Sequence, residues 1–157
     1  MGMHKETAKM GVDDLVALDR VFSGLPVDDK PELLSALAER AGRYVGVPAD
    51  AIVEALRKRE SFGSTGIGRG IAIPHTAVKG LRRSVGFLAR LEHPIDFESV
   101  DNKPVDLVFL LLTPPTPESE NIAALASISR RLRDASVLSA LRSSKSAQEM
   151  YNRLVNS

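Results

Sequence analysis

The sequence predicts a single-domain α/β fold in which helices flank a mixed β-sheet on both faces. The chain has 157 residues, the size of one ordinary domain. Two helix patterns come first, strand patterns surround a glycine-rich segment, and helix patterns return at the C-terminal end. Because strands and helices do not alternate regularly, a mixed sheet is expected rather than a regular parallel one.

The N-terminal part of the chain carries few structural signals. Residues 1–11 are polar and are expected to form a flexible leader, with residues 12–157 as the folded domain. Between positions 14 and 26, scattered apolar residues are followed by Gly24 and Pro26, which indicates a short strand or edge element.

Two amphipathic helices are expected next. The first begins at an N-cap provided by Asp28 or Asp29 and stops at Gly46. Its apolar stripe consists of Leu33, Leu34, Leu37, Ala38, Ala41 and Val45. The second helix begins at Pro48 and ends in the basic run 57–59, whose positive charge suits the negative end of a helix dipole.

Two strands are expected in the centre of the sequence, at residues 84–91 and 105–112. The second is the longest apolar run of the chain. It is interrupted by Asp106 and is far shorter than the roughly 20 residues of a membrane-spanning helix, so it indicates a buried strand. The segments 93–96 and 101–104 contain turn-forming residues.

Three helices are expected after these strands. Thr116 caps the first, with Pro117 at its first helical position. A short helix follows around residues 137–141. The segment Ser146–Glu149 is a capping box that opens the last helix.

The composition excludes several classes of protein. The absence of cysteine excludes a disulfide framework, a thiolate nucleophile and a cysteine-ligated metal. With 21 Lys+Arg against 20 Asp+Glu, and 4% aromatic residues, nothing favours nucleic-acid binding. The N-terminus lacks a secretory signal, so a cytoplasmic protein without direct membrane insertion is expected. The three histidines are too scattered for a metal site, and no cofactor is expected.

The glycine-rich segment 61–70 has four glycines in eight positions, too many for the interior of a regular helix or strand. It lacks the Gly-Lys-Ser/Thr ending of a P-loop, and its glycine spacing is not GxGxxG. It also follows a helix and precedes a strand, which is the reverse of the dinucleotide fingerprint. Nucleotide binding is therefore disfavoured at this segment.

The same segment and its neighbours have the chemistry to hold a phosphoryl group. Glycine lets several backbone N–H groups approach one anion, and Ser64 and Thr65 add hydroxyl donors. Arg59 offers a planar fork of donors. His75 follows at the end of the apolar strand, and a neutral imidazole can accept and later release a phosphoryl group. Each feature alone is also explained as a turn, a helix end or a strand end, but their combination favours the phosphoryl site.

The stretch from Arg59 to His75 reads RESFGSTGIGRGIAIPH. It resembles the active-site signature of the enzyme IIA domains of the fructose/mannitol type in the bacterial phosphoenolpyruvate-dependent phosphotransferase system. The resemblance extends from about Leu18 to the C-terminus, and it is greatest to the stand-alone, nitrogen-related enzyme IIA proteins. It implies a phosphoacceptor domain with a mixed sheet flanked by helices.

The resemblance also implies the roles of individual residues. His75 would be phosphorylated on Nε2 by a histidine phosphocarrier protein, and Arg59, Ser64, Thr65 and Gly66 would hold the phosphoryl group. Members of the family commonly carry a second histidine where this chain has Asn121. An amide can donate a hydrogen bond to a phosphoryl oxygen but cannot become cationic.

Three functions are compatible with the resemblance. The first is a regulatory phosphotransfer protein of the nitrogen-related branch, acting on partners such as kinases or transporters. The second is a sugar-specific enzyme IIA that passes phosphate to a separate permease component. The third is a protein-binding module that works without phosphorylation.

The other histidines and the basic clusters carry weaker signals. His4 lies in the leader and His93 in an expected turn, and neither is expected to have a function. Five basic residues form either a docking patch or solvated helix ends: Arg130, Arg131, Arg133, Arg142 and Lys145.

Overall fold

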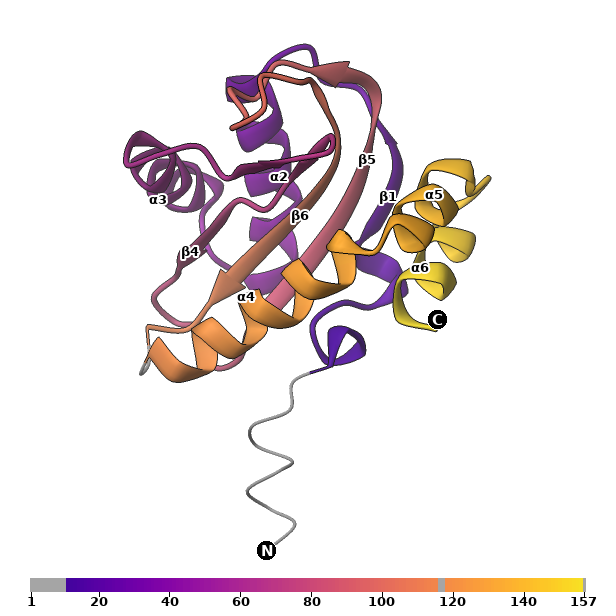
Figure 1. Ribbon diagram of the computed structural model, residues 1–157. Helices are drawn as coiled ribbons and strands as arrows, with labels where there is room; N and C mark the ends of the chain where they lie inside the picture. Colours follow the sequence, from indigo (N-terminus) through magenta and orange to yellow (C-terminus); the bar gives the residue numbers. More distant parts are fainter. Residues whose placement is uncertain (1–10, 116–117, 157) are drawn as a thin grey trace, which may run out of the picture.

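The computed structural model describes residues 11–115 and 118–156. Within these residues, one mixed six-stranded sheet lies between two layers of helices, as the sequence predicts (Figure 1). Except for Gly11, the expected leader lies outside the described residues, and so do Thr116 and Pro117.

The elements follow one another without a regular alternation of strand and helix. The strands are β1 (Val21–Leu25), β2 (Gly66–Gly68), β3 (Ile71–Ala72), β4 (His75–Ala77), β5 (Val85–Ile95) and β6 (Val105–Thr113). Two short 3₁₀ helices come before β1, η1 (Val12–Asp14) and η2 (Leu18–Arg20). The α-helices are α2 (Lys30–Val45), α3 (Ala49–Ser61), α4 (Glu118–Arg133), α5 (Ala135–Ser143) and α6 (Ala147–Val155).

The strand β6 is the centre of the sheet. The order is β1-β5-β6-β3-β2, and β4 also pairs with β6. β6 runs antiparallel to β5 and parallel to both β3 and β4. Residues 107–112 are all 1% exposed or less, which confirms the buried strand predicted from the apolar run.

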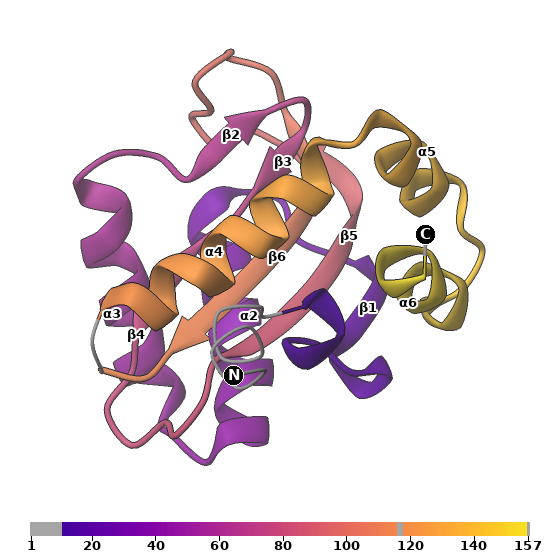
Figure 2. The same cartoon turned by 60° about the horizontal axis from the view of Figure 1, so that its bottom comes forward.

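Helices cover both faces of the sheet. Side chains of a strand alternate between the two faces, so neighbouring residues of β6 belong to different cores. Val108, Leu110 and Leu112 belong to the apolar core with residues of α2 and α3. Leu107 and Phe109 belong to a second core with residues of η1, α4, α5 and α6. Figure 2 shows α4 lying across β6 on this second face.

Local signals determine the ends of most helices. The Asp29 side chain accepts a hydrogen bond of 2.8 Å from the backbone N–H of Glu32, so Asp29 is the N-cap of α2. Gly46 ends α2 in the left-handed conformation, with φ of 75°. Ser146 caps α6 by accepting a bond of 3.1 Å from the N–H of Glu149. These caps confirm the predicted boundaries.

Two expectations about the strands are wrong. β5 continues to Ile95, through the segment predicted as a turn, and its register with β6 shifts between Arg90 and Ile95. Pro94 is exposed in the irregular part of the strand, where it is tolerated because a regular ladder of hydrogen bonds is absent. The glycine-rich segment also contains a short strand, β2, which pairs irregularly with β3.

Candidate functional site

His75 begins a strand, whereas the sequence predicted that it would end one. The apolar strand β3 ends at Ala72, and β4 begins at His75. Pro74 separates the two strands because it has no N–H to donate to the ladder. Its carbonyl still accepts a hydrogen bond of 2.9 Å from Leu111 N–H, and His75 is in register with Leu111. The buried strand β6 therefore holds His75 in place.

The imidazole of His75 has one nitrogen committed to the backbone. Its Nδ1 lies 2.7 Å from the carbonyl oxygen of Ile73. A carbonyl can only accept a hydrogen bond, which assigns the proton of the neutral ring to Nδ1. Nε2 then carries the lone pair, so it is the nucleophilic atom of this side chain.

The surroundings of His75 favour the neutral ring. Burial of the imidazole lowers the pKa of His75, and the positive charge of Arg59 lowers it further. The bond to the Ile73 carbonyl and the negative charge of Glu60 act in the opposite direction, and the net pKa is below the usual histidine value. The ring is therefore neutral, and able to act as a nucleophile, at neutral pH.

His75 lines a pocket of about 400 Å³ at one end of the sheet. α3, β4 and the start of α4 meet there (Figure 2). The pocket is lined by residues of α3, β4, β6 and α4: Arg59, His75, Thr76, Ala77, Leu111, Thr113, Asn121, Ile122 and Leu125. Of the predicted site residues, Arg59, His75 and Asn121 are therefore brought together.

Arg59 lies in the last turn of α3, next to the glycine-rich segment. Its Nη1 donates a hydrogen bond of 3.0 Å to the carbonyl oxygen of Gly63. Guanidinium has five N–H donors, so most of them are available to an anion in the pocket. The bond to Gly63 fixes the direction of the side chain and leaves other N–H groups of the guanidinium for a phosphoryl group.

The predicted donors Ser64, Thr65 and Gly66 form hydrogen bonds inside the protein. The Ser64 hydroxyl donates to the carbonyl of Phe97 at 2.9 Å and accepts from Gly66 N–H at 3.0 Å. Thr65 donates its N–H to Glu60 Oε1 at 3.0 Å, and its hydroxyl donates to Glu60 Oε2. None of the three lines the pocket in this structure, and their direct binding of a phosphoryl group stays a prediction.

Glu60 organises the loop through a buried ion pair. Its side chain is 6% exposed and pairs with Lys30, which is 13% exposed, with 3.0 Å between Oε1 and Nζ. The Lys30 ammonium also lies 4.4 Å from the centre of the Phe97 ring. Sequence reasoning gave Glu60 no role, although it stands directly beside Arg59 and contributes to the charge around His75.

Asn121 presents an unusual buried amide to the pocket. Its Nδ2 donates to the carbonyl of Pro114 at 3.3 Å. Its Oδ1 is buried and has no hydrogen-bond partner among the residues that the structure describes. A buried polar atom without a partner is costly. Because Oδ1 can only accept, an anion cannot satisfy it, and the Nδ2 group is the part of this side chain that can face a phosphoryl oxygen.

Sequence reasoning also missed the two threonines of the pocket. Thr76 follows His75 directly, and Thr113 is in register with Ala77 at the end of β6. The Thr76 hydroxyl donates to the carbonyl of Ala77 and the Thr113 hydroxyl to the carbonyl of Thr76, each at 3.5 Å. These bonds are long, so an anion could take over either hydroxyl as a donor. Thr76 could have been found from its position beside His75. Thr113 could not, because its proximity depends on the parallel pairing of β4 with β6.

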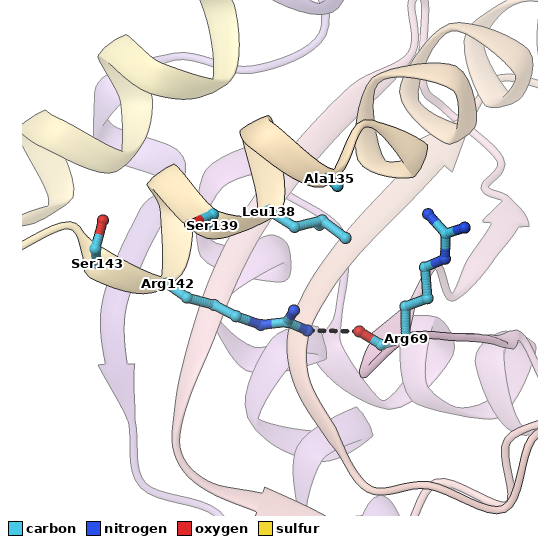
Figure 3. A pocket seen from close by; sticks show the side chains of 6 residues that line it. All are labelled: Arg69, Ala135, Leu138, Ser139, Arg142 and Ser143. Atoms are coloured by element: carbon cyan, nitrogen blue, oxygen red, sulfur yellow. Dashed lines mark hydrogen bonds between the residues drawn. The ribbon is translucent and has the colours of Figure 1, made fainter.

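A second hollow, of about 730 Å³, lies between α5 and the turn that joins β2 to β3 (Figure 3). None of the predicted phosphoryl-site residues lines it. Arg142 donates to the carbonyl of Arg69 at 2.6 Å and pairs with Asp106 at 2.8 Å. Arg131 donates to the carbonyl of Leu154 at 2.6 Å. Two of the five basic residues considered for a docking patch therefore connect elements of the fold: Arg142 joins α5 to β6 and to the turn before β3, and Arg131 joins α4 to α6.

The remaining histidines lie outside the pocket. His93 is exposed and lies 3.6 Å from Glu92, and His4 is outside the described residues. Across residues 11–115 and 118–156, the helices are too short or too polar to cross a membrane. The same ranges hold no group of three or more histidine or acidic side chains placed to share a metal ion.

Comparison with known proteins adds independent information. Residues 14–157 match the family described as phosphoenolpyruvate-dependent sugar phosphotransferase system, EIIA 2. The nitrogen regulatory protein of Bradyrhizobium diazoefficiens is 43% identical over 143 residues, which cover 91% of this chain and 94% of that protein.

Two solved structures are similar in fold. The nitrogen regulatory protein IIA-Ntr from Neisseria meningitidis superposes with a TM-score of 0.86 at 29% identity, over 91% of this chain and 98% of its own. Enzyme IIA mannitol from Escherichia coli, solved in complex with phosphorylated enzyme IIB mannitol, superposes with a TM-score of 0.74 at 21% identity, over 91% of this chain and 100% of its own. The second likeness concerns the fold alone.

Proposed function

Because the chain belongs to the phosphoenolpyruvate-dependent sugar phosphotransferase system EIIA 2 family, whose members are phosphotransfer components, we propose that it accepts a phosphoryl group on His75. The observation that carries the proposal is the arrangement of the imidazole. Nδ1 is hydrogen-bonded to the Ile73 carbonyl, and His75 and Arg59 line the same pocket.

The reaction is a transfer between two histidines. The donor is a histidine phosphocarrier protein in its phosphorylated form. The lone pair of His75 Nε2 attacks the phosphorus atom, a new N–P bond forms, and the N–P bond of the donor breaks. The electron pair of that bond returns to the donor imidazole. His75 keeps its Nδ1 proton, and the Ile73 carbonyl stabilises the positive charge that develops on the ring.

Several side chains of the pocket suit a phosphoryl group. The group brings a charge of about −1.5 to −2, and hydrogen bonds to a charged group contribute roughly 1.5–3 kcal/mol each. Arg59 supplies the cation, and Asn121 supplies the N–H of its amide that is not bonded to Pro114. The hydroxyls of Thr76 and Thr113 add neutral donors once they give up their 3.5 Å bonds to backbone carbonyls. In this proposal Ser64, Thr65 and Gly66 hold the loop in place in the unphosphorylated state, and they bind the phosphoryl group only if the loop rearranges.

We assign the chain to the regulatory, nitrogen-related branch. The support is its 43% identity to a nitrogen regulatory protein over nearly the whole length of both chains. The Neisseria IIA-Ntr structure supports the same branch at the level of the fold and sequence. The mannitol complex shows that an enzyme IIA of this fold meets a phosphorylated protein directly, which supports transfer from protein to protein.

Intact-mass measurement tests the acceptor. The protein is incubated with phosphoenolpyruvate, the first enzyme of the system and the histidine phosphocarrier protein. We expect one acid-labile phosphoryl adduct on the wild-type chain, no adduct on His75→Ala, and an unchanged adduct on His93→Ala, the matched control. An adduct that persists in His75→Ala would refute the assignment.

A second experiment tests regulation. Cells that carry His75→Ala are compared with cells that carry the wild-type gene, with nitrogen-dependent growth and sugar uptake as readouts. We expect altered nitrogen-dependent growth and unchanged uptake. Loss of uptake of one sugar would instead identify a sugar-specific enzyme IIA. An effect equal to that of the wild-type protein in every condition would identify a binding module that does not need phosphorylation.

A further inference from the structure

A third hollow, of about 460 Å³, lies at the opposite edge of the sheet from His75. Its lining residues come from η2, β1, α2 and β5, whereas His75 begins β4, on the other side of β6. Figure 1 shows β1 and β4 on opposite sides of β6. Three arginines line it, Arg20, Arg40 and Arg43. The rings of Phe22 and Tyr44 contribute apolar walls. Its volume is within the range of small-molecule sites.

The hollow has an excess of positive charge. Asp19 is the one carboxylate among its lining residues, and it lies 3.8 Å from Arg20 with a mostly exposed side chain. Arg40 and Arg43 lie one turn apart on α2, and among the described residues they donate to carbonyls of their own helix, at 3.4 and 3.5 Å. The Arg40 guanidinium also lies 5.3 Å from the centre of the Phe22 ring. Within the described part of the chain, no carboxylate lies within ion-pair distance of Arg40 or Arg43.

Arg20 is a buried and fixed cation. The residue is only 9% exposed, and its Nε donates to the carbonyl of Gly86 at 3.1 Å. Nη2 donates to the carbonyl of Leu15 at 3.4 Å, and Nη1 donates to the Tyr44 hydroxyl. Carbonyl oxygens satisfy its hydrogen bonds but do not neutralise its charge. The exposed carboxylate of Asp19, 3.8 Å away, compensates that charge only from the solvent side, and an anion in the hollow would add a second counter-charge without any reorganisation of Arg20.

From this arrangement we propose that the hollow binds a small anion with two phosphate groups. Guanidinium forks match phosphate oxygens, and an excess of about two positive charges suits a diphosphate better than a monoanion. The hollow of Figure 3 is less suited, because Arg142 there is already paired with Asp106. Diphosphate is present both as inorganic pyrophosphate and in nucleotides. The Arg20 guanidinium covers one face of the Tyr44 ring, 4.5 Å from its centre, so the two forms of the ligand are distinguished by experiment and not by a stacking surface.

Calorimetric titration with pyrophosphate at low salt tests the proposal. We expect saturable binding to the wild-type chain that is weakened at least about tenfold in Arg40→Gln/Arg43→Gln, because each loss removes a charge-assisted contact. The matched control is Arg82→Gln/Arg83→Gln, which removes the same charge from two exposed residues outside the hollow. It should bind like the wild type. Equal weakening in both double variants would overturn the proposal, because only total charge would then matter.

Two further arms define the ligand. Tighter binding of ADP than of pyrophosphate would identify a nucleotide, and equal binding would identify inorganic diphosphate; both results support the site. Binding of citrate without binding of pyrophosphate would overturn the assignment to phosphate. So would the absence of saturable binding by either diphosphate.

Amide chemical shifts locate the site. With pyrophosphate, we expect shifts at residues 19–22 and 40–44, in the wild type and equally in His75→Ala. Shifts confined to residues around Arg59 and His75 would overturn the proposal and assign the anion to the other pocket. Because His75→Ala abolishes phosphorylation and leaves this hollow intact, failure of the diphosphate site and failure of the proposed function give different results.

Discussion

Glu60→Gln tests whether the buried ion pair holds the glycine-rich loop. The substitution keeps the size of the side chain and one carbonyl oxygen that can accept from Thr65, but it removes the negative charge. Lys30 is 13% exposed, and its Nζ lies 3.0 Å from Glu60 Oε1. Among the described residues, Lys30 would then keep Glu98 as its ionic partner, at 3.4 Å and with an exposed carboxylate.

The expected loss of stability is about 2–4 kcal/mol. Removal of one partner from a buried pair costs about 3–5 kcal/mol, because the other charge is left buried without compensation. Partial exposure of Lys30 and the remaining contact with Glu98 reduce this figure. Loss of the charged acceptor for the Thr65 N–H and hydroxyl adds about 1 kcal/mol.

Urea denaturation followed by circular dichroism measures the effect. The matched control is Glu54→Gln, an exposed residue of the same helix, which should change stability by less than about 0.5 kcal/mol. A double-mutant cycle with Lys30→Met should give a coupling energy of about 1–3 kcal/mol. A loss below about 0.5 kcal/mol for Glu60→Gln, additive with Lys30→Met, would refute the role of the ion pair.

Three more predictions concern the site and its surroundings. Arg59→Gln should slow phosphoryl transfer to His75 about 10- to 100-fold in rapid-quench assays. The control Arg57→Gln, at an exposed position of the same helix, should leave the rate unchanged. Equal rates for the wild type and Arg59→Gln would show that Arg59 has no part in the reaction. In an NMR titration the pKa of His75 should lie below the usual histidine value and rise in Arg59→Gln, because the Arg59 charge lowers it. Because the pKa of His75 is lower in the folded than in the unfolded state, the unfolded state binds a proton at this residue first as the pH falls from about 7.5 to 5.5. The wild type should therefore lose stability relative to His75→Ala over this range. A gain in stability would contradict the effect of burial on the pKa. Arg142→Gln should cost about 0.5–1.5 kcal/mol, measured by urea denaturation, and leave phosphorylation unchanged; a parallel loss of phosphorylation would connect the hollow of Figure 3 to His75.

The parts of the fold that the sequence predicts correctly depend on local signals. The caps of α2 and α6 are determined by residues within four positions of Asp29, Gly46 and Ser146. The buried strand β6 follows from one uninterrupted stretch of large apolar residues after Asp106. The prediction for β5 was too short because the strand continues through turn-forming residues. Such residues are compatible with the C-terminal part of β5, where the pairing with β6 is irregular between Arg90 and Ile95.

The parts of the site that sequence reasoning missed depend on long-range contacts. Lys30 and Glu60 are 30 positions apart, and Ser64 bonds to a carbonyl 33 positions away. The partner of the Ser64 hydroxyl therefore cannot be inferred locally. Glu60, the partner of Thr65, is only five positions away, but no pattern of the segment indicates that its carboxylate turns toward the loop. Arg59 and His75 were found because their chemistry and the 59–75 signature both single them out, and Asn121 was found because it stands where members of the family commonly carry a second histidine. Thr113 was not, because its place beside the pocket is a consequence of strand pairing.

The contacts that hold His75 and the loop before it limit the ways in which a partner protein could distinguish the two phosphorylation states. His75 lies in register with β6, and Glu60 and Ser64 hold the loop before it, so the proposed phosphorylation of Nε2 would require little movement of the backbone. The added charge of about −1.5 to −2 instead reverses the electrostatic field of a pocket whose cation is Arg59. Ile122, 62% exposed, stands at the rim of the same pocket. A partner that covers this apolar rim would meet opposite fields in the two states, so the fold can report phosphorylation through charge alone.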